Sequence, residues 1–170
     1  EAVVYSVLPN LGKILLMLDQ NGDENYQPMW VPLEGGIPTP VFGDKFKGQQ
    51  VYCTHVDTRR AIALFSVDPR RDPVHRTFLA DLTTLETVDL GDSLYGNVPF
   101  AYDDEFRTFV LADQYSFGDV VLYLKEPDGE RKLLFGAPMD ARRPGEQVAP
   151  NGIGSAHLRP GGGLVFVSSI

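Results

Sequence analysis

Residues 13–42 read KILLMLDQNGDENYQPMWVPLEGGIPTPVF, and this stretch decides how the rest of the sequence is interpreted. An apolar run at 14–18 and a second strand-forming run at 26–33 lie on either side of a short polar segment. A second reversal at 34–36 leads into a further expected strand over 37–42. Asn21 and Gly22 in that segment tolerate the positive φ angles of a tight reversal, which predicts a β-hairpin. A hairpin cannot bury its faces alone, so the unit is expected to recur along the chain.

Four strongly apolar runs do recur at a similar spacing. The residues that precede them are separated by 48 positions from Gly12 to Arg60, by 46 from Arg60 to Phe106 and by 57 from Phe106 to Gly163. A period of about 40–50 residues is typical of four-stranded propeller blades. A polar insertion at 140–150 accounts for the longer third interval.

The repeat predicts an all-β fold, a β-propeller, with about three and a half four-stranded blades of a larger propeller in this chain. The expected blades span 1–46, 47–92 and 93–138, followed by a half blade over 139–170. The remaining blades are expected from a longer protein or from another chain, since open blade edges favour association. A small self-contained β-sandwich is the alternative, and it requires the repeat to be a coincidence.

Composition excludes several classes of function. The chain has 170 residues, of which 43% are hydrophobic, and a net charge of −8, so no basic surface is expected to hold a nucleic acid. Cys53 is the single cysteine, which excludes an intrachain disulfide. No apolar run approaches the roughly 20 residues that a membrane span needs. We therefore expect a cytoplasmic protein that binds neither nucleic acid nor membrane.

The hairpin carries a family resemblance. Residues 16–27, LMLDQNGDENYQ, and residues 31–36, VPLEGG, resemble a propeller blade of the prolyl oligopeptidase family and its acylaminoacyl-peptidase-like relatives. The family pattern is a hydrophobic strand, Asp-x-Asp/Asn-Gly-Asp-Glu-Asn-Tyr, and a strand ending in Gly-Gly. The resemblance implies a propeller of seven or eight blades that covers a C-terminal α/β-hydrolase domain with a Ser-Asp-His triad.

The catalytic part of such a protein is not found in this sequence. No Gly-x-Ser-x-Gly elbow occurs, and the nearest string, around Ser155, has His157 where the second glycine is needed. No catalytic residue is therefore assigned. The resemblance implies that the partners are the hydrolase domain or the remaining blades, and that a peptide or small ester reaches the parent enzyme through this region.

Two arginine pairs are the candidate contact residues. Arg70 and Arg71 lie in one long loop of the expected blades, and Arg142 and Arg143 lie in another. Long propeller loops often form a binding face, and guanidinium groups bind carboxylates. We expect these residues to gate the substrate or to dock a second domain. Solvated or internally paired arginines are the alternative.

Metal sites are expected to be absent, although four residues are candidates for one. Asp19, Asn21 and Asp23 alternate as in the first half of a calcium loop, but the sixth position is Glu24 and the twelfth is Trp30. A hairpin tip whose side chains bond their own backbone explains the same composition. No cofactor is expected.

Asn151 is the fourth candidate. It lies in a Pro-Asn-Gly-Ile string that resembles an element of gluconolactonase and regucalcin-like propellers, where the Asn helps to bind a divalent metal. An Asn-Gly turn that enters a strand is the structural alternative. Cys53 and His55 share one strand face, and we interpret them as a buried thiol and a hydrogen-bonded imidazole.

The predicted function follows from the resemblance. The chain is expected to supply the propeller part of a prolyl-oligopeptidase-like serine hydrolase, where it admits substrate and docks on the catalytic domain. A non-enzymatic TolB-like scaffold and a gluconolactonase-like metal-dependent enzyme are the two alternatives.

Overall fold

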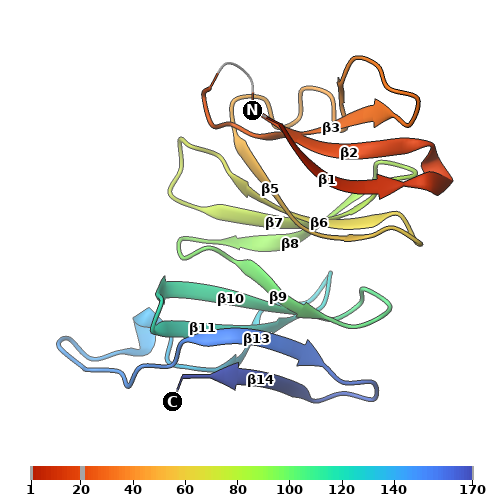
Figure 1. The fold of residues 1–170 in the computed structure, drawn as a ribbon. Coiled ribbons are helices and arrows are strands. Elements are labelled where there is room, and N and C mark those ends of the chain that lie inside the picture. Colours follow the sequence, from red (N-terminus) through yellow and green to blue (C-terminus); the bar gives the residue numbers. More distant parts are fainter. Residues whose placement is uncertain (1, 20–21, 170) are drawn as a thin grey trace. The chain divides into compact units, whose positions relative to one another are not determined.

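The computed structural model describes residues 2–19 and 22–169, and nearly all regular structure in them is β-strand (Figure 1). The chain divides into two compact units, residues 1–91 and 92–170. Every sheet is antiparallel, and the strands within each sheet are neighbours in the order of the sequence. Three of the four hydrophobic runs form inner strands of four-stranded sheets, and the fourth, which begins at Leu164, forms one strand of the two-stranded sheet.

The N-terminal unit contains two four-stranded sheets, ordered β1-β2-β3-β4 and β5-β6-β7-β8. A single 3₁₀ turn, η1 (Pro9–Leu11), joins the first two strands and ends at Gly12, whose φ is +63°. The strands are β1 (Ala2–Leu8), β2 (Lys13–Leu18), β3 (Gln27–Pro32), β4 (Thr39–Pro40), β5 (Gln50–Asp57), β6 (Ile62–Asp68), β7 (His75–Asp81) and β8 (Thr87–Ser93).

An aromatic cluster forms the centre of this unit. The Phe65 ring stacks on Phe78 with centroids 5.2 Å apart, and Phe42 meets both rings edge-on at 5.5 and 5.7 Å. Phe46 stacks on the ring of Phe78 at 4.9 Å. Trp30 belongs to the same core and is 5% exposed. Burial of these large side chains is the main stabilising contribution in the unit.

The C-terminal unit contains one four-stranded sheet, ordered β12-β11-β10-β9, and one two-stranded sheet, β13-β14. Val110 and Val120 of the first sheet pack with Ile153 and Ala156 of the second in one hydrophobic core. The elements are β9 (Val98–Tyr102), β10 (Phe109–Ser116), β11 (Asp119–Lys125), β12 (Lys132–Phe135), the 3₁₀ turn η2 (Met139–Ala141), β13 (Ile153–Leu158) and β14 (Leu164–Ser168).

Three four-stranded sheets and one two-stranded sheet confirm the all-β architecture predicted from the repeat. The main difference is the fourth strand, expected over 37–42 and observed only as β4 (Thr39–Pro40). Pro38 and Pro40 have no N–H to donate to a ladder, and Ile37 is 87% exposed, so the segment gains little from pairing. Asn21, in the tip of the first hairpin, lies outside the described residues.

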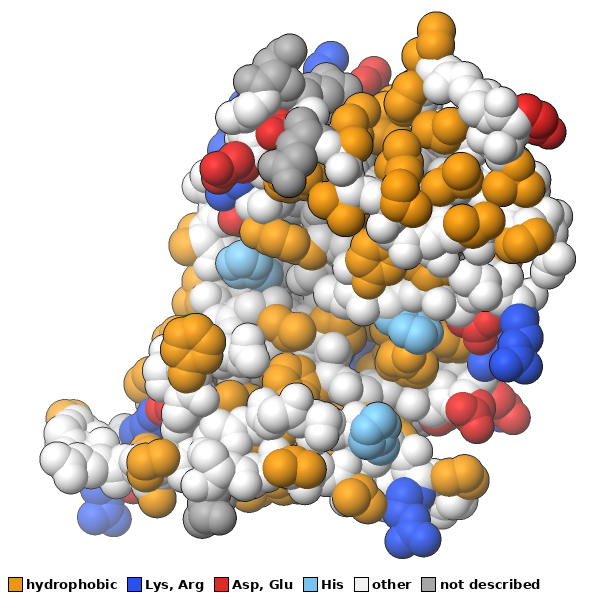
Figure 2. Space-filling view, in the orientation of Figure 1, with side chains coloured by type: hydrophobic (Ala, Val, Ile, Leu, Met, Phe, Trp, Pro, Cys, Tyr) orange, Lys and Arg blue, Asp and Glu red, His pale blue; other side chains and the backbone are white. Residues whose placement is uncertain are grey.

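Exposed hydrophobic side chains gather on the N-terminal unit over β1 and its neighbours, at the upper right of Figure 2. Three β1 valines are the clearest examples, with Val3 47%, Val4 66% and Val7 45% exposed. β1 is also an edge strand of its sheet. Within the described part of the chain, no helix has the length and apolarity to cross a membrane.

Candidate binding site

The two arginine pairs have different surroundings in the structure. Arg70 links two loops of the N-terminal unit, since its Nε donates to Oδ1 of Asn25 at 3.1 Å and its Nη2 donates to the carbonyl of Glu24 at 3.3 Å. Its Nη1 also lies 3.5 Å from Oδ2 of Asp68. Arg71, the next residue, is exposed. Arg70 thus has a structural role in addition to any contact it makes with a ligand.

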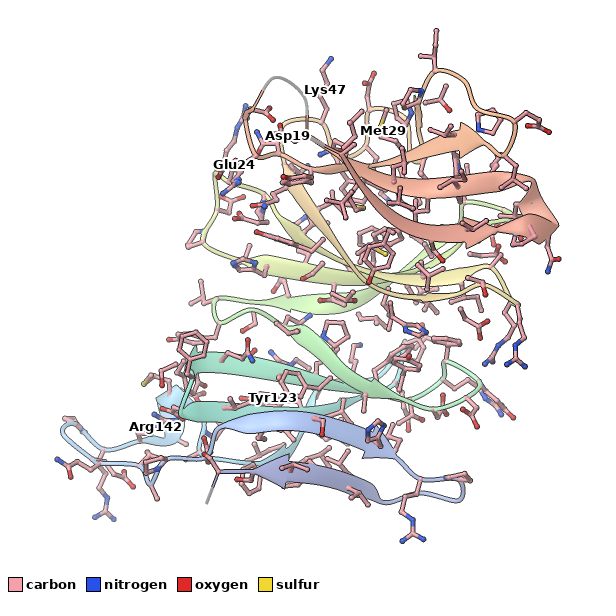
Figure 3. All side chains as sticks on the ribbon, in the orientation of Figure 1. Asp19, Glu24, Met29, Lys47, Tyr123 and Arg142 are labelled. Carbon is pink, nitrogen blue, oxygen red and sulfur yellow. The ribbon has the colours of Figure 1, made fainter. Side chains whose placement is uncertain are left out.

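The polar tip of the first hairpin is organised by its own carboxylates. Oδ1 of Asp19 accepts the backbone N–H groups of Asp23 at 3.1 Å and Glu24 at 3.2 Å, and Asp19 and Glu24 are labelled in Figure 3. Asp23 accepts the backbone N–H of Asn25 at 3.0 Å, and this hydrogen bond is the main reason why the pKa of Asp23 is lowered. These hydrogen bonds are the kind expected of a hairpin tip whose side chains bond their own backbone.

Cys53 and Ser155 are the two candidate nucleophiles that the sequence raises, and neither has the surroundings of an activated nucleophile. Burial raises the pKa of the Cys53 thiol to about 12, so the thiolate that binds metals or attacks substrates is disfavoured. Ser155 and His157 are both exposed on β13. Across residues 2–19 and 22–169, no three His, Cys, Asp or Glu side chains are grouped to hold a metal ion.

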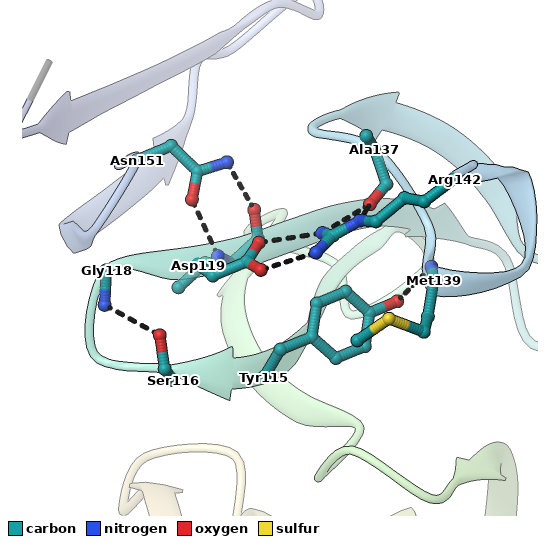
Figure 4. A network of polar contacts seen from close by, with 9 residues as sticks. Tyr115, Ser116, Gly118, Asp119, Ala137, Met139, Arg142 and Asn151 are labelled. Atoms are coloured by element: carbon teal, nitrogen blue, oxygen red, sulfur yellow. Dashed lines mark hydrogen bonds and ion pairs between the residues drawn. The ribbon is translucent and has the colours of Figure 1, made fainter. Parts of the chain in front are cut away.

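Arg142 is held in the C-terminal unit by a dense set of contacts (Figure 4). Its guanidinium donates to both carboxylate oxygens of Asp119 at 2.6 and 2.8 Å, and its Nε donates to the carbonyl of Ala137 at 2.9 Å. The guanidinium carbon also lies 4.8 Å from the centroid of the Tyr115 ring. Arg142 is therefore the centre of a brace that fixes the long loop after β12. Arg143 beside it is exposed.

Asn151 fixes the other end of the same loop. Its Oδ1 accepts the backbone N–H of Val120 at 2.7 Å, and its Nδ2 donates to the carbonyl of Val120 at 3.0 Å, so the amide imitates a paired strand. A Cβ on Gly152 would lie 2.6 Å from the carbonyl oxygen of Phe117, which explains the glycine. The Asn-Gly pair thus has a structural role, although no turn is formed at these two residues and Asn151 instead pairs with the backbone of Val120.

A cavity of about 450 Å³ lies in the C-terminal unit, in the neighbourhood of Arg142. Its lining is rich in tyrosine, and we call it the tyrosine cavity. Tyr95 meets Tyr115 edge-on with centroids 4.4 Å apart. The lining residues are Ser93, Leu94, Tyr95, Asp113, Tyr115, Tyr123, Met139 and Asp140.

The arginine of a second ion pair contacts two residues of the cavity lining, Tyr123 and Asp113. The Arg131 guanidinium lies 3.9 Å from the centroid of Tyr123 and donates to Oδ1 of Asp113 at 2.9 Å. Burial is the main cause that raises the pKa of Tyr123 to about 12, so its phenol stays neutral at physiological pH. Sequence reasoning missed this site, although four of the seven tyrosines lie between 95 and 123.

Comparison with known proteins supports a fold class. No family model and no curated protein matches the sequence. The chain is similar to a chain in the crystal structure of a nidogen/laminin complex, with a TM-score of 0.50 and 12% identity over 95% of this chain and 53% of that one. It is also similar to a chain from a structural analysis of two prolyl endopeptidases, with a TM-score of 0.52 and 11% identity over 93% and 23%.

These similarities and the observed sheets identify an all-β, β-propeller-like fold. The chain spans about half the length of the first of these proteins and about a quarter of the second.

Proposed function

We propose that this chain is a non-catalytic binding segment of the propeller in a prolyl-oligopeptidase-like serine hydrolase. In this role its loops admit a peptide or small ester substrate and dock on a separate catalytic domain. The proposal rests on the hairpin motif at 16–27 together with the fold similarity to a prolyl endopeptidase chain. The missing nucleophile elbow agrees with a binding role, because the proposed chemistry belongs to another domain.

The geometry of the loops supports a division of tasks among the arginines. Arg142 is committed to Asp119 and Ala137, whereas Arg71 and Arg143 are exposed. We therefore assign contact with a carboxylate-bearing substrate or domain to Arg71 and Arg143. Arg142 and Arg70 position the loops that present them.

A non-enzymatic protein scaffold is the second candidate. The similarity to a chain of the nidogen/laminin complex favours this candidate. That match covers 53% of the nidogen/laminin chain, whereas the other match covers 23% of the prolyl endopeptidase chain. A scaffold of this kind uses the same exposed loops and needs no second domain. The gluconolactonase-like alternative loses its main support, because the amide of Asn151 is bonded to Val120.

Hydrolysis by the full-length protein encoded by the gene separates the candidates. We expect it to cleave short proline-containing peptides, and we expect Arg143→Glu to raise KM several-fold with kcat unchanged, because the exposed arginine contacts substrate before the reaction. Arg159→Glu, an exposed arginine of another turn, is the control. Absence of hydrolysis would favour the scaffold, and an unchanged KM would remove Arg143 from the proposal.

A further inference from the structure

The geometry points to the tyrosine cavity as a binding site for the guanidinium group of an arginine side chain in a peptide segment. This inference holds for a hydrolase and for a scaffold alike, because it concerns equilibrium binding and not cleavage. The ligand of this cavity is a cation, whereas the exposed arginines, Arg71 and Arg143, attract carboxylates. Three features of the cavity support it: its rings, its charge and its size.

The rings of the cavity already hold guanidinium groups within the protein. Arg131 lies over Tyr123 at 3.9 Å and Arg142 lies over Tyr115 at 4.8 Å. Aromatic faces attract cations, and a planar guanidinium can also stack on them. Each internal arginine covers one face of its ring. Tyr95, which meets Tyr115 edge-on, adds a third ring to the lining.

The charge around the cavity favours an incoming cation. The cavity and its supports contain three carboxylates, Asp113, Asp119 and Asp140, against the two guanidiniums of Arg131 and Arg142. One negative charge therefore remains. Asp140 is exposed, and in the part of the chain that the structure describes it forms no ion pair.

Asp113 can take part in binding through its second oxygen. Its side chain is 6% exposed, and Oδ1 accepts from Arg131. Within residues 2–19 and 22–169, Oδ2 of Asp113 accepts no hydrogen bond, while the residue lines the cavity. A buried carboxylate with one oxygen already bonded is stabilised when its other oxygen accepts a hydrogen bond from a second cationic donor.

The size and rim of the cavity suit a side chain that is presented by a peptide. A volume of about 450 Å³ lies within the usual range of roughly 300–1,000 Å³ for ligand pockets. Leu94 and Met139 at the lining are 57% and 43% exposed, which leaves apolar surface for the residues beside the arginine. Met and Tyr are enriched in such contact surfaces.

Two peptides test the inference on the protein as it exists. Acetyl-Gly-Arg-Gly-amide is titrated by calorimetry or NMR, and the same peptide with citrulline is the neutral, nearly isosteric comparison. We expect the arginine peptide to bind at least about ten-fold more tightly, because citrulline lacks the charge that the rings and carboxylates attract. Equal affinity of the two peptides, or no binding of either at millimolar concentration, would overturn the inference.

Two variants locate the site. Asp140→Asn, at an exposed position, is expected to weaken the arginine peptide several-fold, whereas Asp128→Asn in the β11–β12 turn is the matched control and should change nothing. Tyr95→Phe is expected to keep binding and Tyr95→Leu to weaken it, because the ring and not the hydroxyl attracts the cation. Full affinity in both Asp140→Asn and Tyr95→Leu would place the peptide elsewhere and refute the assignment.

Discussion

The two units of this chain join their sheets by different means. In the N-terminal unit, four phenylalanines, Phe42, Phe46, Phe65 and Phe78, pack ring against ring at centroid distances of 4.9–5.7 Å. In the C-terminal unit, a smaller apolar core is supplemented by side chains that bond the backbone across the loop from 136 to 152. The comparison indicates that repeated sheets of one fold can be held by burial in one place and by polar contacts in another.

The largest expected effect comes from the aromatic cluster. Phe65→Ala should lower the free energy of unfolding by about 3–5 kcal/mol, because a fully buried ring is replaced by a cavity. Urea unfolding followed by the fluorescence of Trp30, the single tryptophan, reports on the same core. Phe117→Ala is the control, since that ring is fully exposed. A similar midpoint for both variants would contradict the burial account of this unit.

The hydrogen bonds of Asn151 are the main polar contacts that we expect to stabilise the C-terminal unit. Asn151→Ala should destabilise the C-terminal unit by about 2 kcal/mol, because the N–H and carbonyl of buried Val120 lose their partners. Amide exchange at Val120 should become faster. Gln147→Ala, an exposed amide in the same loop, should leave that rate unchanged. Unchanged exchange at Val120 in Asn151→Ala would show that the amide contacts are not needed.

A smaller effect is expected at the Arg142 brace. Arg142→Lys keeps the charge but cannot donate in parallel to both oxygens of Asp119, so a loss of about 1 kcal/mol in stability is expected. Thermal unfolding of this variant is compared with that of Arg143→Lys, whose side chain is exposed. Equal unfolding temperatures for the two variants would mean that the bidentate pair contributes nothing measurable.

The smallest effect concerns the pH dependence of the N-terminal unit. Burial lowers the pKa of His55 below its ordinary value of 6.5, although Asp57 acts in the opposite direction. The unfolded chain therefore binds the proton more readily, so stability should fall as the pH drops below about 6.5 and level off beneath the folded-state pKa. His55→Gln should remove this slope in pH-dependent unfolding, whereas His157→Gln, an exposed site, should retain it. An identical slope in both variants would contradict the burial of His55.

The sequence predicts much of this fold because the spacing of the apolar runs and the residue types at the turns can both be read from short stretches of the chain. Apolar runs such as 14–18 and 109–112 lie in β2 and β10, and Asp19 bonds the turn beside it. Even so, the predicted strand at 37–42 is mostly absent, since its prolines remove ladder donors.

The candidate site was largely hidden from sequence reasoning. Tyr95, Tyr115 and Tyr123 lie on different parts of the chain, and the pairing of β10 with β11 determines which of their rings share a cavity. The same applies to Arg142, whose sequence neighbourhood does not reveal that it pairs with Asp119, 23 residues earlier. Contacts of this kind depend on tertiary packing and leave no periodic pattern.

The proposed function assigns binding to this chain and catalysis to a separate domain, and serine labelling tests this proposal most directly. The full-length protein encoded by the gene is treated with a fluorophosphonate probe, digested and mapped by mass spectrometry. The account predicts a labelled serine outside residues 1–170 and none within them. Labelling of Ser155, or of any other serine in this chain, would contradict it.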